Sequence, residues 1–185
     1  MTSQQVEAVL KGKLEQRLKQ ADLQNLGVKS ASLIRKMIID RILAGKDLYG
    51  NNFGSYSSNY DKAKAWAYAA AKYGTYKYSS SSESAKLRLT GRLLNRIIVK
   101  FEGYRKTGTG ITYKYLITTG QDVKDQVEGL QSTTGVVRTK NGKQRYSKKA
   151  WYFLGISKEL GEQDKLKNYL GQRLKMSGTI KTKNI

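Results

Sequence analysis

Apolar residues recur at every fourth position near the start of the chain. Within residues 3–20, these positions are Val6, Leu10, Leu14 and Leu18. Side chains spaced by four lie on one face of a helix, and Ser3 is a suitable N-cap for it. The pattern predicts a narrow amphipathic helix, which Gly12 weakens and which needs a partner surface.

A wider apolar face follows residues 26–30, "LGVKS", where the first pattern is interrupted. Its members are Leu33, Ile34, Met37, Ile38, Ile42 and Leu43. Ser30 or Ser32 can cap the helix that this face predicts. Gly45 is a natural end for the helix, because glycine readily adopts the left-handed backbone conformation of a C-terminal cap.

The period of the pattern changes within residues 87–103, "LRLTGRLLNRIIVKFEG". The first half has leucines at helical spacing, and the second half alternates: Ile97, Val99 and Phe101. Residues 111–118 alternate in the same way, with Ile111, Tyr113, Tyr115 and Ile117 on one side. The two runs flank a Gly-containing stretch, so we expect a short helical turn and then a β-hairpin with its turn in residues 103–110.

The remaining segments carry weaker patterns. We expect an ordered loop in residues 46–60, an Ala-rich helix in 60–74, an exposed Ser-rich stretch in 79–84, a short helix in 121–130 and a basic excursion in 132–151. Ser157 offers an N-cap for a last helix, whose apolar stripe comprises Leu160, Leu166, Leu170 and Leu174.

Together these elements predict an α+β fold, in which helices flank an antiparallel β-sheet with a central hairpin and an N-terminal helical arm precedes it. The expected division is an amphipathic arm in residues 1–28, an α+β domain in 29–175 and a flexible C-terminal tail in 176–185. No apolar run is long enough for a transmembrane helix, and the first residues do not resemble a secretory signal. We therefore expect no membrane association.

The amino-acid composition limits the classes of function that the chain can have. The 185 residues include 35 Lys and Arg against 14 Asp and Glu, a net charge of +21 that is spread along the whole chain. A folded protein with this much positive charge is expected to bind a polyanion or acidic surfaces of other proteins. The chain has no Cys and no His, which excludes thiolate zinc sites, cysteine nucleophiles and imidazole bases. We expect a protein that is not an enzyme and has no cofactor and no metal.

Three chemical alternatives compete with structural ones. Asp122, Asp125 and Glu128 would share a helix face and could hold a metal ion, as in a nuclease, but acids at a helix start also suit its dipole. Residues 103–110, "GYRKTGTG", could cradle a phosphate, but they lack the P-loop order and suit a hairpin turn. Tyrosines beside lysines, as in "YKY" at 76–78 and 113–115, could stack on bases or cover a half-buried sheet face.

Four stretches, taken together and in this order, resemble a known family, the virion-morphogenesis proteins of tailed phages, which are tail-completion or neck proteins. They are residues 38–60, residues 87–103, the hairpin that follows, and residues 145–157, and three motifs of the family fall within them. The first falls on Gly45, Asp47, Gly50, Phe53, Tyr56 and Ser57. The second falls on Leu89, Thr90, Gly91, Leu93, Leu94, Asn95 and Ile97. The third falls on Phe153, Leu154, Gly155, Ile156 and Ser157.

The resemblance implies a structural virion protein that forms a homo-oligomeric ring, a hexamer or dodecamer, at the head–tail junction. Its expected partners are the portal or head–tail connector, the tail tube proteins and, without base specificity, packaged DNA; assembly would occur in the host cytoplasm. The family-motif and interface candidates are Asp47, Gly50, Phe53, Tyr56, Thr90, Gly91, Asn95, Phe153, Leu154 and Gly155. The candidate DNA-channel or polyanion contacts are Arg105, Lys106, Arg138, Lys140, Lys143 and Arg145. The alternative function is that of a basic protein that binds DNA or RNA non-specifically.

Overall fold

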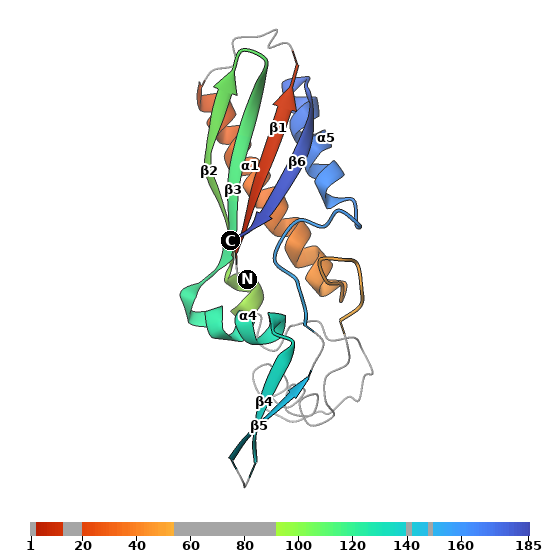
Figure 1. Ribbon diagram of the computed structural model, residues 1–185. Helices are drawn as coiled ribbons and strands as arrows, with labels where there is room; N and C mark the ends of the chain where they lie inside the picture. Colours follow the sequence, from red (N-terminus) through yellow and green to blue (C-terminus); the bar gives the residue numbers. More distant parts are fainter. Residues whose placement is uncertain (1–2, 13–19, 54–91, 140–141, 148–149) are drawn as a thin grey trace, which may run out of the picture.

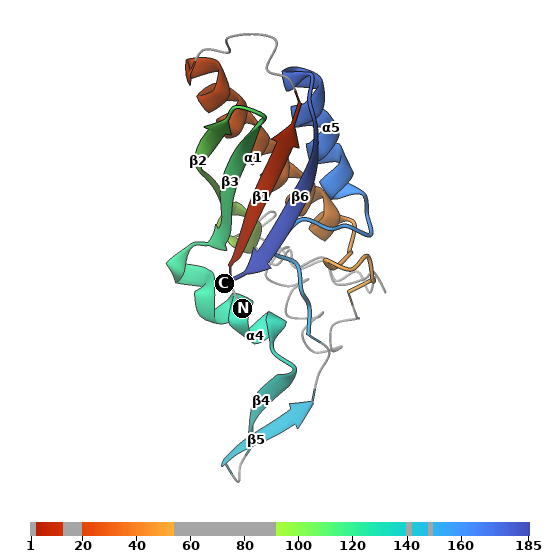
Figure 2. The same ribbon diagram turned by 45° about the horizontal axis from the view of Figure 1, so that its top comes forward.

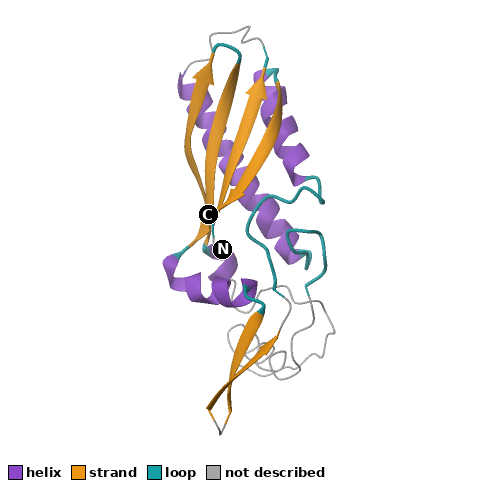
Figure 3. Cartoon of the chain, viewed as in Figure 1, coloured by secondary structure: helices purple, strands orange, loops and turns teal. Residues whose placement is uncertain are grey.

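A computed structural model describes residues 3–12, 20–53, 92–139, 142–147 and 150–185 of the chain. Its centre is a four-stranded antiparallel sheet with the strand order β2-β3-β1-β6 (Figure 1). The strands are β1 (Gln4–Lys11), β2 (Ile97–Thr107), β3 (Gly110–Thr119) and β6 (Ser177–Asn184). Helices α1 (Gln20–Leu43) and α5 (Glu162–Leu174) lie on one face of this sheet, as Figure 3 shows by colour. The predicted α+β fold with an antiparallel sheet is confirmed.

The predicted hairpin is confirmed as β2 and β3. The two strands pair from Ile97↔Thr119 to Thr107↔Gly110, so the turn itself consists of Gly108 and Thr109. A bulge between Phe101 and Gly103 shifts the register by one residue. Residues 103–107, expected in the turn, therefore continue the strand.

Alternation in the sequence becomes a covered and an open face of the sheet. Tyr113 and Tyr115 are fully buried under the helices, whereas Lys114 between them is exposed on the other face. The aromatic rings of Phe101 and Tyr104 lie 5.9 and 6.0 Å from the ring of Tyr113. The tyrosines at 113–115 thus belong to the core, which confirms the sheet-face interpretation and leaves neither available for stacking on bases.

The helix predicted at the N-terminus is wrong, because residues 4–11 form β1, an inner strand of the sheet. Val6, Ala8 and Leu10 point into the core and are fully buried. A spacing of four is also a multiple of the strand period of two, so Val6 and Leu10 fit either structure. A long helix does lie in the N-terminal part of the chain, but it begins at Gln20.

Helix α1 runs through the residues that were expected to interrupt it. Gly27 lies inside the helix against the ring of Phe101, whose Cζ would stand 2.5 Å from an added Cβ. Ser30 is not a cap but a buried side chain, with its Oγ 2.6 Å from the hydroxyl of Tyr115. Both residues are small because sheet side chains contact the helix there. The predicted end is confirmed, since α1 stops at Leu43 and Gly45 has a φ of 74°.

The C-terminal tail is also part of the sheet, so its prediction as a flexible segment is wrong. β6 pairs with β1 along its whole length, from Gln4↔Asn184 to Lys11↔Ser177. Only Ile180 in this strand is a large apolar residue, which explains the weak pattern. Because β1 and β6 pair with each other, residues 1–28 and 176–185 do not separate from the central domain as expected.

A second group of elements lies beyond the end of the sheet (Figure 2). The turn α3 (Arg92–Asn95) leads into β2, and η1 (Gln121–Val123) with α4 (Lys124–Gln131) follows β3, which confirms the predicted short helix. The basic excursion is a two-stranded hairpin of β4 (Thr134–Thr139) and β5 (Gly142–Ser147), which extends away from the sheet (Figure 1).

The last helix begins later than predicted. Gly161, not Ser157, is its N-cap; the hydroxyl of Ser157 instead accepts a hydrogen bond from the amide of Leu160, 3.1 Å away. Leu160 consequently lies outside the helix and is exposed, while the rest of the predicted stripe, Leu166, Leu170 and Leu174, is buried.

Several predictions fall outside the described residues: the Ala-rich helix at 60–74, the Ser-rich stretch at 79–84, the "YKY" at 76–78, and Tyr56, Thr90, Gly91 and Lys140. Among the helices that the structure describes, none is long and apolar enough to cross a membrane.

Candidate assembly interface

The first motif forms a tight loop directly after α1. Asp47 is buried, and its Oδ1 accepts hydrogen bonds from the backbone amides of Tyr49 (2.9 Å) and Asn51 (2.8 Å). Gly50 has a φ of 79°, a conformation that other residues rarely adopt. The aspartate and the glycine of this motif therefore shape the loop.

The third motif lies in an irregular segment, residues 150–161, which passes the start of β1 and ends in a turn. Gly155 has a φ of 132°, and an added Cβ would lie 2.7 Å from Oε1 of Gln4. The same Oε1 accepts a hydrogen bond from the amide of Ile156 at 3.1 Å. Gly155 thus lets the segment approach β1 closely.

A buried arginine of α1 binds the backbone of the third motif. The Arg41 side chain, 1% exposed, donates through Nη1 to Glu162 and through Nη2 to the carbonyls of Phe153 (2.6 Å) and Gly155 (2.9 Å). Glu162 Oε2 also accepts from the amide of Ser157 at 2.7 Å. Burial lowers the pKa of Arg41, while the carboxylate of Glu162 and, more weakly, that of Asp47 raise it. We call this group the Arg41 clasp.

Aromatic side chains gather outside the clasp. Phe53 of the first motif is buried and contacts Trp151, with 5.4 Å between ring centroids. Tyr49 and Tyr152 meet edge to face at 5.9 Å, yet they are 51% and 39% exposed. Leu160 is 37% exposed and packs beside Gly50. We call Tyr49, Tyr152 and Leu160 the aromatic corner.

The structure brings together the described residues of the first and third motifs, but not those of the second. Phe153, Leu154 and Gly155 are buried behind the aromatic corner, next to the loop of Asp47, Gly50 and Phe53. Asn95 lies in α3, exposed, where its carbonyl accepts a long hydrogen bond (3.5 Å) from Arg35. The exposed members of the corner, Tyr49, Tyr152 and Leu160, were not predicted as site residues.

The predicted polyanion contacts are separated. Arg105 pairs with Thr112 and Lys106 with Ile111, so these neighbours lie on opposite faces of the sheet. Arg138 and Lys143 are register partners in the β4–β5 hairpin, and Arg145 pairs with Val136 two positions further along that ribbon. Figure 1 shows the hairpin at the opposite end of the molecule from the β2–β3 turn, so the structure does not bring the candidates in β4 and β5 together with Arg105 and Lys106.

A second surface was missed, the face of the sheet turned away from α1 and α5. Its basic residues are Lys11, Lys100, Arg105, Lys114, Lys181 and Lys183. Apart from Arg105 none was predicted, because they converge only when β1 and β6 are recognised as strands. We call this surface the open sheet face.

The metal alternative has no support in the described residues. Asp122 pairs with Arg96 (3.1 Å), Glu128 lies 4.0 Å from Lys124, and no three His, Cys, Asp or Glu side chains in the described ranges converge on one point. The hairpin interpretation of residues 103–110 is confirmed by the pairing of β2 and β3.

Comparisons of the chain with protein-family models, with curated proteins and with solved structures found no match. The functional interpretation therefore depends on the two surfaces, the aromatic corner and the open sheet face, and on the resemblance of the three motifs.

Proposed function

We propose that this chain is a structural virion protein of a tailed bacteriophage, a neck or tail-completion subunit whose copies form a ring that joins head to tail. The observation that carries the proposal is the meeting of the first and third motifs at the aromatic corner. Two stretches about 100 residues apart in sequence, both similar to the same family, build one exposed apolar surface.

Exposed aromatic residues held on a rigid base are typical of protein–protein interfaces. The Arg41 clasp supplies part of this base, because it binds the backbone of the segment that carries Tyr152, and the amide of Leu48 in the first motif donates to the carbonyl of Tyr152 at 2.6 Å. If the corner of one copy binds a different surface of the next, the contact repeats head to tail and closes into a ring when the rotation allows. A hexamer or dodecamer, located at the head–tail junction with portal and tail tube proteins as neighbours, is the proposed assembly.

Mass photometry and negative-stain imaging of the purified protein, alone and with neck partners, test this proposal. We expect rings from the wild type and their loss in the double variant Tyr49→Ser/Tyr152→Ser. The matched control is Val28→Ser/Ile185→Ser, which removes two apolar residues that are each 52% exposed elsewhere on the molecule. Monomers under all conditions, or equal loss of rings in both double variants, would contradict the proposal.

A second candidate function is non-specific binding of DNA or RNA by a protein outside the virion. The net charge of +21 and the open sheet face favour it. Binding to nucleic acid by a protein that never assembles would support this candidate over the first.

A further inference from the structure

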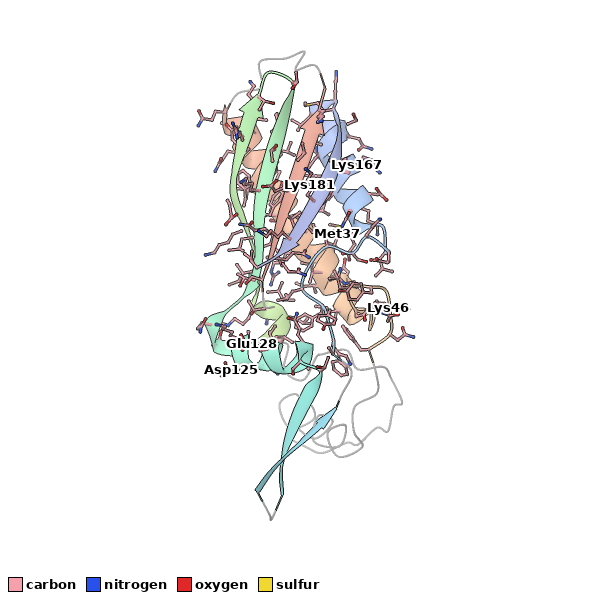
Figure 4. All side chains as sticks on the ribbon, viewed as in Figure 1. Met37, Lys46, Asp125, Glu128, Lys167 and Lys181 are labelled. Carbon is pink, nitrogen blue, oxygen red and sulfur yellow. The ribbon has the colours of Figure 1, made fainter. Side chains whose placement is uncertain are left out.

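The open sheet face is a regular grid of side chains across four strands. One row runs Lys114, Glu7 and Lys181 over β3, β1 and β6. The next row, two residues along, runs Lys100, Leu116, Gln5 and Lys183 from β2 to β6. Figure 4 labels Lys181 in front of the sheet and Lys167 on α5.

Positive charge dominates this grid. Against its six basic residues stand Glu7 and the exposed Glu102 of the bulge. Lys114 Nζ lies 3.3 Å from Glu7 Oε1, and Lys181 is the register partner of Glu7 on β6, so a single carboxylate stands between two lysine positions. No described helix covers the face, and the helices α1 and α5 both lie behind it (Figure 3).

We propose that the open sheet face binds the phosphodiester backbone of nucleic acid, without reading its bases. Register partners are about 4.8 Å apart across strands and alternate residues about 6.6 Å apart along a strand. Lys181 and Lys183 on the edge strand β6 can therefore contact neighbouring phosphates. Lys114 on β3 and Lys100 on β2 can contact further phosphates toward the opposite edge of the same face.

The composition of the face favours nucleic acid over a protein partner. Lysine and glutamate are depleted in protein interfaces, whereas aromatic residues are enriched. No tyrosine of β2 or β3 lies on the open face, which offers cations, threonines such as Thr112 and Thr179, and the aliphatic side chains of Val9, Ile98 and Leu116. Without aromatic side chains it also lacks a platform for bases, so contact with phosphates alone is expected.

The test is fluorescence anisotropy with labelled duplex DNA and a single strand of the same sequence. The variant Lys100→Gln/Lys114→Gln/Lys181→Gln/Lys183→Gln removes four charges from the face. The control Lys29→Gln/Lys158→Gln/Lys165→Gln/Lys167→Gln removes four from α1, α5 and the turn before α5, so both variants have the same net charge.

For the wild type we expect binding at about 50 mM salt that falls steeply towards about 200 mM. The face variant should bind about tenfold or more weakly, with a salt slope for duplex DNA smaller by up to about 3.6, because each of the four lost phosphate contacts removes about 0.9 from the slope of log K against log salt. The control should stay within about threefold of the wild type. Several unrelated duplexes should bind equally.

Equal losses in both variants would overturn the proposal, since total charge alone would then explain binding. So would the absence of wild-type binding at about 50 mM salt. If the face variant lost binding to polyglutamate but not to DNA, the face would belong to an acidic protein instead. The inference does not require the ring: mass photometry of the same samples reports assembly separately, so monomers that bind DNA through this face would refute only the proposed function.

Discussion

The Arg41 clasp and the open sheet face contain ion pairs of the same chemical kind in opposite surroundings. In the clasp, the side chains of Arg41 and Glu162 are 1% and 5% exposed. On the open face, those of Lys114 and Glu7 are 54% and 39% exposed. In the clasp, both charged groups are bound within the fold, since each also forms hydrogen bonds with backbone groups. Charge on the open face remains available to a partner.

The difference follows from desolvation. A charge removed from water destabilises the fold unless hydrogen bonds replace its hydration, so the clasp depends on its geometry. Exposed charges keep their hydration, so a pair of them contributes little and tolerates substitution. The clasp therefore supports the aromatic corner, whereas the open face can change its charges without loss of the fold. The predictions below test that contrast.

The largest loss of stability is expected from Arg41→Ala. The substitution leaves Glu162 and the carbonyls of Phe153 and Gly155 buried without their donor, so we expect a loss of about 3–5 kcal/mol in the free energy of unfolding. Urea denaturation followed by circular dichroism measures it. Lys114→Ala on the open face is the control and should change stability by less than about 1 kcal/mol. Similar values for the two variants would remove the distinction between the regions.

Gly155→Ala is expected to lower the free energy of unfolding less than Arg41→Ala does. The new Cβ would meet Gln4 at a φ of 132°, so strain and displacement of the 150–161 segment should lower stability by about 1–3 kcal/mol. Gly129→Ala in α4 is a matched control, since nothing lies within 4 Å of its added Cβ. That variant should gain about 0.5–1 kcal/mol, because alanine is the better helix former. Thermal melts of both proteins check the opposite signs.

The hairpin and its covered face could be predicted from the sequence because alternation over two adjacent runs is a local signal. The other two strands could not. Val6 and Leu10 are spaced by four, which suits a helix as well as a strand, and the partner of β1 lies more than 100 residues away. The edge strand β6 has no fully buried residue, and the partly buried Ile180 alone marks it as apolar. Long-range pairing, rather than local preference, determines both.

For the candidate surfaces, the sequence identified motif residues but not their structural roles. The motif residues Asp47, Gly50 and Gly155 were identified, but their roles in shaping a loop and a close approach depend on backbone angles and on contacts distant in sequence. Gly27 and Ser30 were read as an interruption and a cap because the contacts that explain them, with Phe101 and Tyr115, come from strands far along the chain. The open face was missed because only β2 and β3, two of the four strands that build it, were predicted.

The buried tyrosines of the covered face make stability depend on pH in the alkaline range. Burial raises the pKa of Tyr113 and Tyr115 above the usual value of about 10. Below pH 10 both states keep these protons; above it the unfolded chain releases them first, so the free energy of unfolding falls by up to about 1.4 kcal/mol per pH unit for each tyrosine. Urea unfolding at pH 10 and pH 11 should show a smaller fall in Tyr113→Phe/Tyr115→Phe, which retains every lysine.

The two buried hydroxyls should also differ from each other. Tyr115 shares a hydrogen bond of 2.6 Å with Ser30, so Tyr115→Phe should cost about 1 kcal/mol. The hydroxyl of Tyr113 has no hydrogen-bond partner among the described residues, so Tyr113→Phe should leave stability unchanged or raise it by up to about 1 kcal/mol. Chemical denaturation of the two single variants at neutral pH measures the difference. A larger loss in Tyr113→Phe would show that this hydroxyl is hydrogen-bonded in solution.

The smallest effect is expected for the exposed pair of Glu7 and Lys114, which completes the contrast with the clasp. Their side-chain atoms approach to 3.3 Å across β1 and β3, but both groups are hydrated and Lys181 competes for the same carboxylate. A double-mutant cycle with Glu7→Gln and Lys114→Gln should give a coupling of about 0.2–1 kcal/mol at low salt, which fades as salt rises. On the open face Glu7 also cancels charge that phosphates would otherwise meet. Glu7→Gln should therefore strengthen DNA binding slightly while it weakens the interaction with Lys114. If DNA binding fell together with that interaction, Glu7 would position the lysines instead of neutralising them.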